Sequence, residues 1–134
     1  MELKDYIEEI ELRLFEDNGR HVLRCISEFC KLISEVIPKS GLNAIEVIEQ
    51  YLSGDADGND LINARVLVFD DLENNHKGTP QGEALQAVLC GLFYPIENDE
   101  YFDTVTYAID FCRASMPGIA DDKFKDIIKA EIKA

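Results

Sequence analysis

The side chains that could carry acid–base or nucleophilic chemistry are few or poorly placed. His21 and His76 are the only histidines, and neither lies in a catalytic motif; phosphate-binding glycine loops, H-E-x-x-H and G-x-S-x-G patterns are all missing from the sequence. The 27 acidic residues are so numerous that no carboxylate pair stands out as a general acid and base. We therefore predict that the protein is not an enzyme, and keep a small enzyme with a carboxylate pair as an alternative.

Two patterns match metal sites only in part. His21 and Cys25 are four residues apart and share a helix face, but two ligands do not make a zinc site. Residues 55–60 begin like a calcium loop, yet Asp60 stands where that loop needs glycine, and Val66 where it needs a bidentate glutamate. We expect no metal and no other cofactor, and expect the last Asp or Asn of this loop to cap the next helix.

The cysteines and the first residues of the sequence lead us to expect a cytoplasmic protein. All four cysteines lie in apolar, helix-period contexts without a C-x-x-C pair, which predicts buried thiols rather than disulfides or ligands: Cys25, Cys30, Cys90 and Cys112. The first residues lack the basic and apolar regions of a secretory signal, and no run of 18 apolar residues could span a membrane.

The charge of the chain restricts its partners. Thirteen basic residues against 27 acidic ones give a formal net charge of −14. Nucleic acids and anionic membranes would be repelled by this field, so neither is expected to bind. A basic protein would be attracted and steered toward the surface.

The elements that must position these residues are predicted to be helices throughout. Apolar residues recur at helical spacing, and no segment shows the alternation of a strand. At 134 residues the chain is predicted to form one compact all-α domain, residues 1–134, as a bundle of about seven helices. The expected helices cover residues 3–14, 22–36, 42–52, 59–72, 80–93, 99–116 and 122–132.

Local signals add detail at several positions. Ser40 is placed to cap the third helix, and Gly54 to close it. Thr79 is the expected cap of the fifth helix, with Pro80 at its first position. The small side chain of Gly91 suggests a close approach of another helix.

The fourth helix carries an apolar stripe through Ile62, Val66, Phe69 and Leu72, which we expect to face the core. Phe102 is assigned to the core by the same spacing.

Acidic clusters beside aromatic residues are the candidate partner-binding residues, because aromatic side chains anchor many interfaces while carboxylates attract basic surfaces. The first group is Asp70, Asp71 and Glu73, and the second is Glu97, Asp99, Glu100 and Tyr101.

The stretch from about residue 60 to 115 resembles a known family. The segments concerned are 63–66 leading into 70–73, then 80–95, then 107–114. They are similar to the small, acidic, all-helical immunity proteins that bacteria make alongside polymorphic or contact-dependent growth inhibition toxins. The resemblance implies a cytosolic protein that binds and neutralises a cognate toxin domain, many of which are basic nucleases. A helical adaptor or regulatory subunit of another protein complex is the alternative.

Overall fold

The computed structural model is all-α, as the sequence predicts. It describes residues 1–14, 16–93 and 101–133, with only the backbone described for residues 18 and 101–103. Within these ranges there is no strand. The helices are α1 (Leu3–Glu9), α2 (Glu11–Leu14), α3 (Arg20–Leu32), α4 (Lys39–Ser53), α5 (Gly58–Asp71), α6 (Pro80–Cys90), α7 (Tyr101–Ser115) and α8 (Asp121–Lys133).

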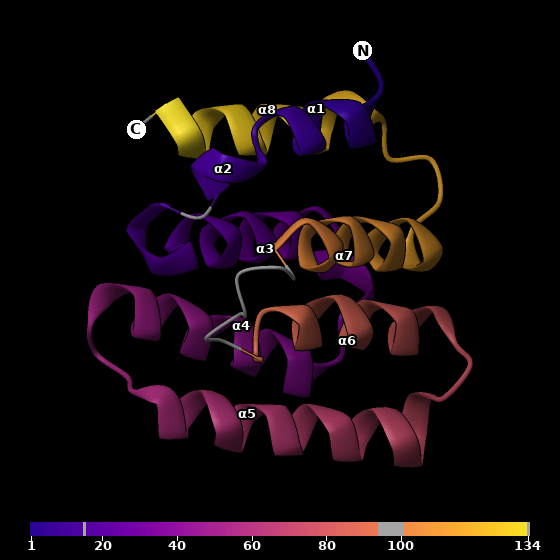
Figure 1. Ribbon diagram of the computed structural model, residues 1–134. Coiled ribbons are helices and arrows are strands. Elements are labelled where there is room, and N and C mark those ends of the chain that lie inside the picture. Colours follow the sequence, from indigo (N-terminus) through magenta and orange to yellow (C-terminus); the bar gives the residue numbers. More distant parts are fainter. Residues whose placement is uncertain (15, 94–100, 134) are drawn as a thin grey trace.

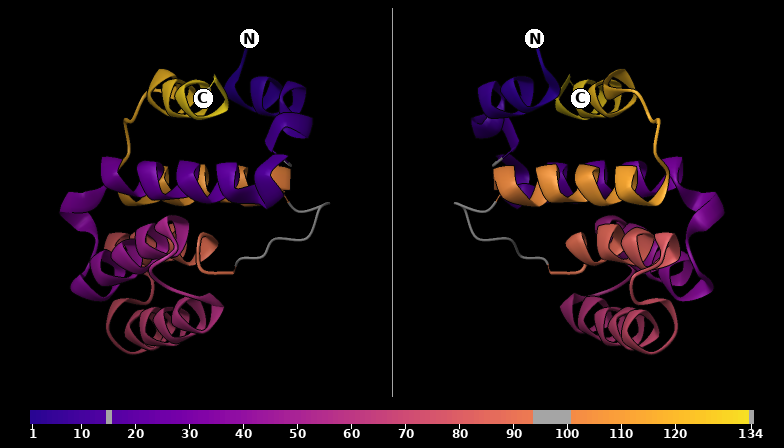
Figure 2. Two further views of the ribbon diagram at one scale, coloured as in Figure 1. Left: turned by 90° about the vertical axis from the view of Figure 1, so that its left-hand side faces the viewer. Right: turned by 90° about the vertical axis from the view of Figure 1, so that its right-hand side faces the viewer.

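The helices stack in tiers (Figure 1). The uppermost tier holds α1, α2 and α8, the next holds α3 and α7, and the third holds α4 and α6. The lowest tier is α5 by itself, packed against α4 and α6 (Figure 2). Because none of the other described helices lies beneath α5, much of its circumference faces solvent.

Several helix ends agree with the local signals. The Thr79 hydroxyl oxygen accepts a bond of 3.0 Å from the Gly82 N–H, with Pro80 at the first helical position. Gly54 closes α4 at a φ of 89°, a left-handed conformation that favours glycine. These three predictions are confirmed.

Other boundaries differ from the prediction. The first predicted helix is divided into α1 and α2 at Ile10, and α3 ends at Leu32, followed by a 3₁₀ turn (Ser34–Val36). Ser40 does not cap α4, which starts at Lys39 directly after Pro38, and it therefore lies inside the first turn.

The polar loop before α5 supplies a cap. Asp57 accepts a bond from the Asp60 N–H at 3.0 Å, while the Asp60 carboxylate accepts one from the Asp57 N–H at 2.8 Å. This reciprocal pair satisfies two N–H groups at the start of α5. A loop residue caps the helix, but it is Asp57 and not the last Asp or Asn of the loop, because the helix begins at Gly58, slightly earlier than predicted.

The core is built around α3. Phe29 of α3 and Phe124 of α8 are both fully buried, and their rings pack edge to face with centroids 5.3 Å apart. Gly91 confirms the expected close approach, because a Cβ there would lie 2.9 Å from Ile48 Cδ1 and 3.2 Å from Ile26 Cγ2.

The cysteines are free thiols and pack as apolar groups. Cys25, Cys30 and Cys112 are buried, and Cys90 is partly buried. Burial raises the pKa of Cys25, Cys90 and Cys112 to about 12, so these thiols stay protonated and unreactive near neutral pH.

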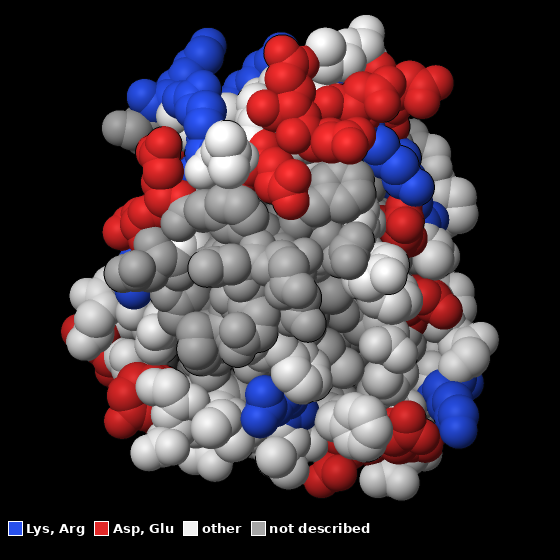
Figure 3. All heavy atoms as spheres, in the orientation of Figure 1, with Lys and Arg blue, Asp and Glu red and all other residues white. Residues whose placement is uncertain are grey.

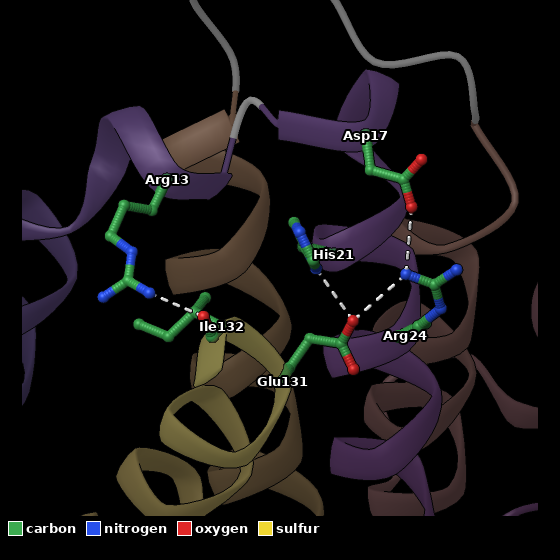
Figure 4. Close-up of polar contacts among 6 residues, drawn as sticks. All are labelled: Arg13, Asp17, His21, Arg24, Glu131 and Ile132. Atoms are coloured by element: carbon green, nitrogen blue, oxygen red, sulfur yellow. Dashed lines mark hydrogen bonds and ion pairs between the residues drawn. The ribbon is translucent and has the colours of Figure 1, made fainter. Parts of the chain in front are cut away.

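Polar contacts hold α8 in place (Figure 4). Glu131 Oε1 accepts bonds from His21 Nδ1 at 2.8 Å and from Arg24 Nη1 at 3.1 Å, which join α8 to α3. Arg13 of α2 donates to the Ile132 carbonyl at 2.6 Å. His21 thus has a structural partner 110 residues away in the chain.

Candidate interaction surface

Most of the apolar stripe predicted to face the core faces solvent instead. Ile62, Val66 and Phe69 are 44%, 52% and 50% exposed, so their assignment to the core is wrong, whereas Leu72 is buried as predicted. The buried side of α5 is a second stripe, formed by Leu61, Ala64, Val68 and the following Leu72. Both stripes have helical spacing, and the position of α4 and α6 decides which one is covered.

The exposed stripe continues onto the end of the α6 segment. Phe93 is 56% exposed, and the guanidinium of Arg65 lies 4.5 Å from the centroid of its ring. A shallow hollow of about 230 Å³ lies between this pair and the residues Val66, Phe69 and Asp70. We refer to Ile62, Val66, Phe69 and Phe93 as the apolar flank of α5.

The opposite side of α5 forms a groove with α4. Its volume is about 700 Å³. Leu67, which is 65% exposed, lines the groove. At 100° per residue Leu67 and Phe69 point about 160° apart. Helix α5 therefore presents two separate surfaces, the apolar flank and the α4–α5 groove.

The residues of the first predicted binding group, Asp70, Asp71 and Glu73, do not share one surface. Asp70 is exposed and lines the hollow at the apolar flank. Asp71 lines the groove, where it accepts bonds from the Ser40 hydroxyl at 2.6 Å and from Asn75 Nδ2 at 2.7 Å. Glu73 forms an ion pair of 3.5 Å with Lys77 one turn later.

The second group lies almost entirely outside the described residues. Glu97, Asp99 and Glu100 are not described, and for Tyr101, the first residue of α7, only the backbone is described. For Phe102, too, only the backbone is described. Their roles stay predictions from the sequence.

The partners of Asp71 make a testable prediction about its titration. Bonds from Ser40 and then Asn75, with the nearby His76, hold the pKa of Asp71 below its ordinary value. The ionised form therefore stabilises the fold above the unfolded-state pKa of about 4, and this contribution is lost as the pH falls through the lower folded-state value.

Replacing Ser40 by alanine should raise the pKa of Asp71. The free energy of unfolding that is lost on acidification should then be smaller. NMR titration of the carboxyl carbon measures the change, and Ser34→Ala, at an exposed serine outside α4, is the control. An unchanged pKa in Ser40→Ala would show that the hydroxyl does not hold this carboxylate.

The described residues offer little for metal or acid–base chemistry. Among them, no group of three or more histidine, cysteine or acidic side chains is placed to hold a metal ion. None of the described helices has the length and apolar content to cross a bilayer. In the view of Figure 3, carboxylates gather at the upper edge near α1, whereas the lower part over α5 is mostly uncharged with isolated acidic and basic groups.

Comparison of the chain with protein-family models, curated proteins and solved structures finds no match. The residues of α5 are therefore the basis for the function proposed below.

The sequence contains a second signal, beyond helical spacing, that points to the exposed surface. Apolar side chains occur on three sides of α5, at Leu61, Ile62 and Leu67, whereas a surface helix of a small bundle buries one side. The excess of apolar residues indicates that this helix packs on the core with one side and can contact a partner with another.

Proposed function

We propose that this protein is an immunity protein that binds a basic bacterial toxin domain of the nuclease class and neutralises it in the cytosol. The observation that carries the proposal is the apolar flank of α5, where three half-exposed apolar side chains lie on successive turns and two of them, Val66 and Phe69, line one hollow with Phe93 and Asp70. A solvated helix face of this composition is typical of a protein-binding surface.

The apolar flank would form the centre of the interface. Completing the burial of a half-exposed aliphatic or aromatic side chain is worth about 1 kcal/mol, so Ile62, Val66 and Phe69 together contribute substantially to affinity. Asp70 lies at the edge of this flank, where a carboxylate can pair with a basic side chain of the toxin.

The net charge of −14 would act at longer range. A basic active-site cleft is attracted to an acidic protein, which raises the association rate. Carboxylates in such a cleft would stand where nucleic-acid phosphates bind, so the substrate would be excluded.

The test combines affinity capture from the native cytosol with a toxicity assay. We expect a basic partner that is toxic when expressed alone and harmless when co-expressed with this protein. The double variant Val66→Lys/Phe69→Lys should bind it at least about tenfold more weakly and lose protection, because each lysine replaces an apolar contact and repels a basic surface.

The control is Leu12→Lys. Leu12 is 78% exposed on α2, in the tier farthest from α5, so this variant should bind and protect like the unmodified protein. Circular dichroism should show that all variants are folded. An acidic or multi-subunit partner would favour the adaptor function instead, and a partner bound equally by the double variant would contradict the role of the apolar flank.

A further inference from the structure

The α4–α5 groove is separate from the apolar flank and about three times larger than the hollow beside Phe93, at about 700 Å³ against 230 Å³. It runs between two helices joined by the short connection at residues 54–57. Leu67 of α5 and the partly buried Val47 of α4 supply accessible apolar surface in its middle, and the buried Ala44 and Ala64 line its floor. With small residues on both helices, the groove is open to a third element.

Carboxylates stand toward both ends of this groove. Asp55 and Asp60 lie near the connection, and Asp71 lies at the other end together with Lys39. Since an α-helix rises 1.5 Å per residue, Asp60 and Asp71 are separated by about 16 Å along α5.

The three carboxylates are held in position before any partner binds. The Asp57 N–H donates to Asp60 at 2.8 Å, and Asp71 accepts from Ser40 at 2.6 Å and Asn75 at 2.7 Å. The Ser53 hydroxyl lies 3.1 Å from Asp55 and 3.0 Å from the Gln50 carbonyl, which share its one proton. A carboxylate has about four acceptor positions, so each can still accept bonds from a cationic side chain.

We propose that the α4–α5 groove binds an amphipathic helix of the protein partner, with a lysine or arginine toward each end of its apolar face. The aliphatic face would pack on the middle of the groove, and the two cations would pair with Asp55 and Asp60 at one end and Asp71 at the other. Residues eleven apart fall on nearly the same side of a helix, about 16 Å apart, which matches the separation of Asp60 and Asp71.

A helix fits this surface better than an extended segment. The described residues contain no strand and so offer no sheet edge to pair with an extended peptide, whereas two antiparallel helices present a straight groove into which the ridges of a third helix can pack. That the bound helix belongs to the toxin domain rests on the function proposed above. That the groove binds a helix with this pattern of charges does not depend on that function.

The probe is a synthetic amphipathic helix of about 18 residues with a leucine and alanine face and two lysines about eleven residues apart. We expect micromolar binding by calorimetry, with amide shifts in Ala44, Val47 and Ala64. Binding should weaken at high salt, and a peptide with glutamate in place of both lysines should not bind.

Matched variants on the two sides of α5 locate the binding. Leu67→Lys should weaken peptide binding at least about tenfold, whereas Phe69→Lys, an equivalent change on the apolar flank, should leave it unchanged. Asp55→Asn should also weaken it, and Asp70→Asn should not. Leu67 and Phe69 are both at least half exposed, so these substitutions are compatible with folding.

The outcomes separate this inference from the proposed function. No binding of the lysine peptide, or binding that Leu67→Lys leaves unchanged, overturns the groove inference even if a toxin is captured through the apolar flank. Peptide binding that Leu67→Lys and Asp55→Asn weaken supports the groove even if the captured partner is not a toxin.

Discussion

Replacing Phe124 by alanine is expected to lower the free energy of unfolding by about 3–5 kcal/mol, the range for removing a fully buried aromatic side chain. The Phe124 ring is inaccessible to solvent, packs edge to face on Phe29 and lies 5.2 Å below the guanidinium of Arg113. These contacts join α8 to α3 and α7, so their loss should loosen the upper tiers. Urea denaturation followed by circular dichroism measures the change.

A double-mutant cycle with Phe29→Leu isolates the contribution of the ring pair, expected at about 0.5–1.5 kcal/mol. The control is Lys133→Ala at the exposed end of α8, which should change stability by less than about 0.5 kcal/mol. A loss below about 1 kcal/mol for Phe124→Ala would mean that α8 is not an integral part of the core.

Replacing Gly82 by alanine should cost about 3 kcal/mol, the upper range for forcing extra volume into a packed site. A Cβ at this position would lie 2.2 Å from the carbonyl oxygen of His76. That oxygen belongs to the π turn (Leu72–His76) that follows α5, and it already accepts a bond of 2.6 Å from the Thr79 hydroxyl. Because the close atom belongs to the backbone and not to a flexible side chain, the backbone at this corner must shift to admit the Cβ.

Gly58→Ala is the matched control, because an added Cβ there meets no atom within 4 Å. Since Gly58 is the first residue of α5, alanine should leave stability unchanged or raise it by up to about 1 kcal/mol. Thermal denaturation of both variants checks the prediction. Equal stabilities for Gly82→Ala and Gly58→Ala would show that the π turn does not pack closely on α6.

Features that depend on local interactions could be predicted from the residues alone. The all-α class follows from helical spacing along the chain, and Thr79 with Pro80 marks the start of α6 because a side chain caps its own helix. The burial of Cys25 and Cys112 and the close packing at Gly91 follow from apolar surroundings and small size.

The direction in which α5 faces depends on the packing of the whole fold. Two stripes of this helix have equivalent spacing, one through Leu61 and Val68 and one through Val66 and Phe69, and a periodicity analysis of one helix cannot choose between them. The choice depends on where α4 and α6 lie, which no local signal contains. The sequence pattern therefore identified the helix but placed its exposed apolar flank inside.

The different surroundings of Asp70 and Asp71 were decided in the same way. Successive residues on a helix point about 100° apart, so one carboxylate borders the apolar flank while the other lies in the groove near Ser40, 31 residues away in sequence. The pairing of His21 with Glu131 joins residues 110 apart. Such contacts depend on the relative placement of whole helices. The packing of the core sets this placement, and the residues that form the contacts do not.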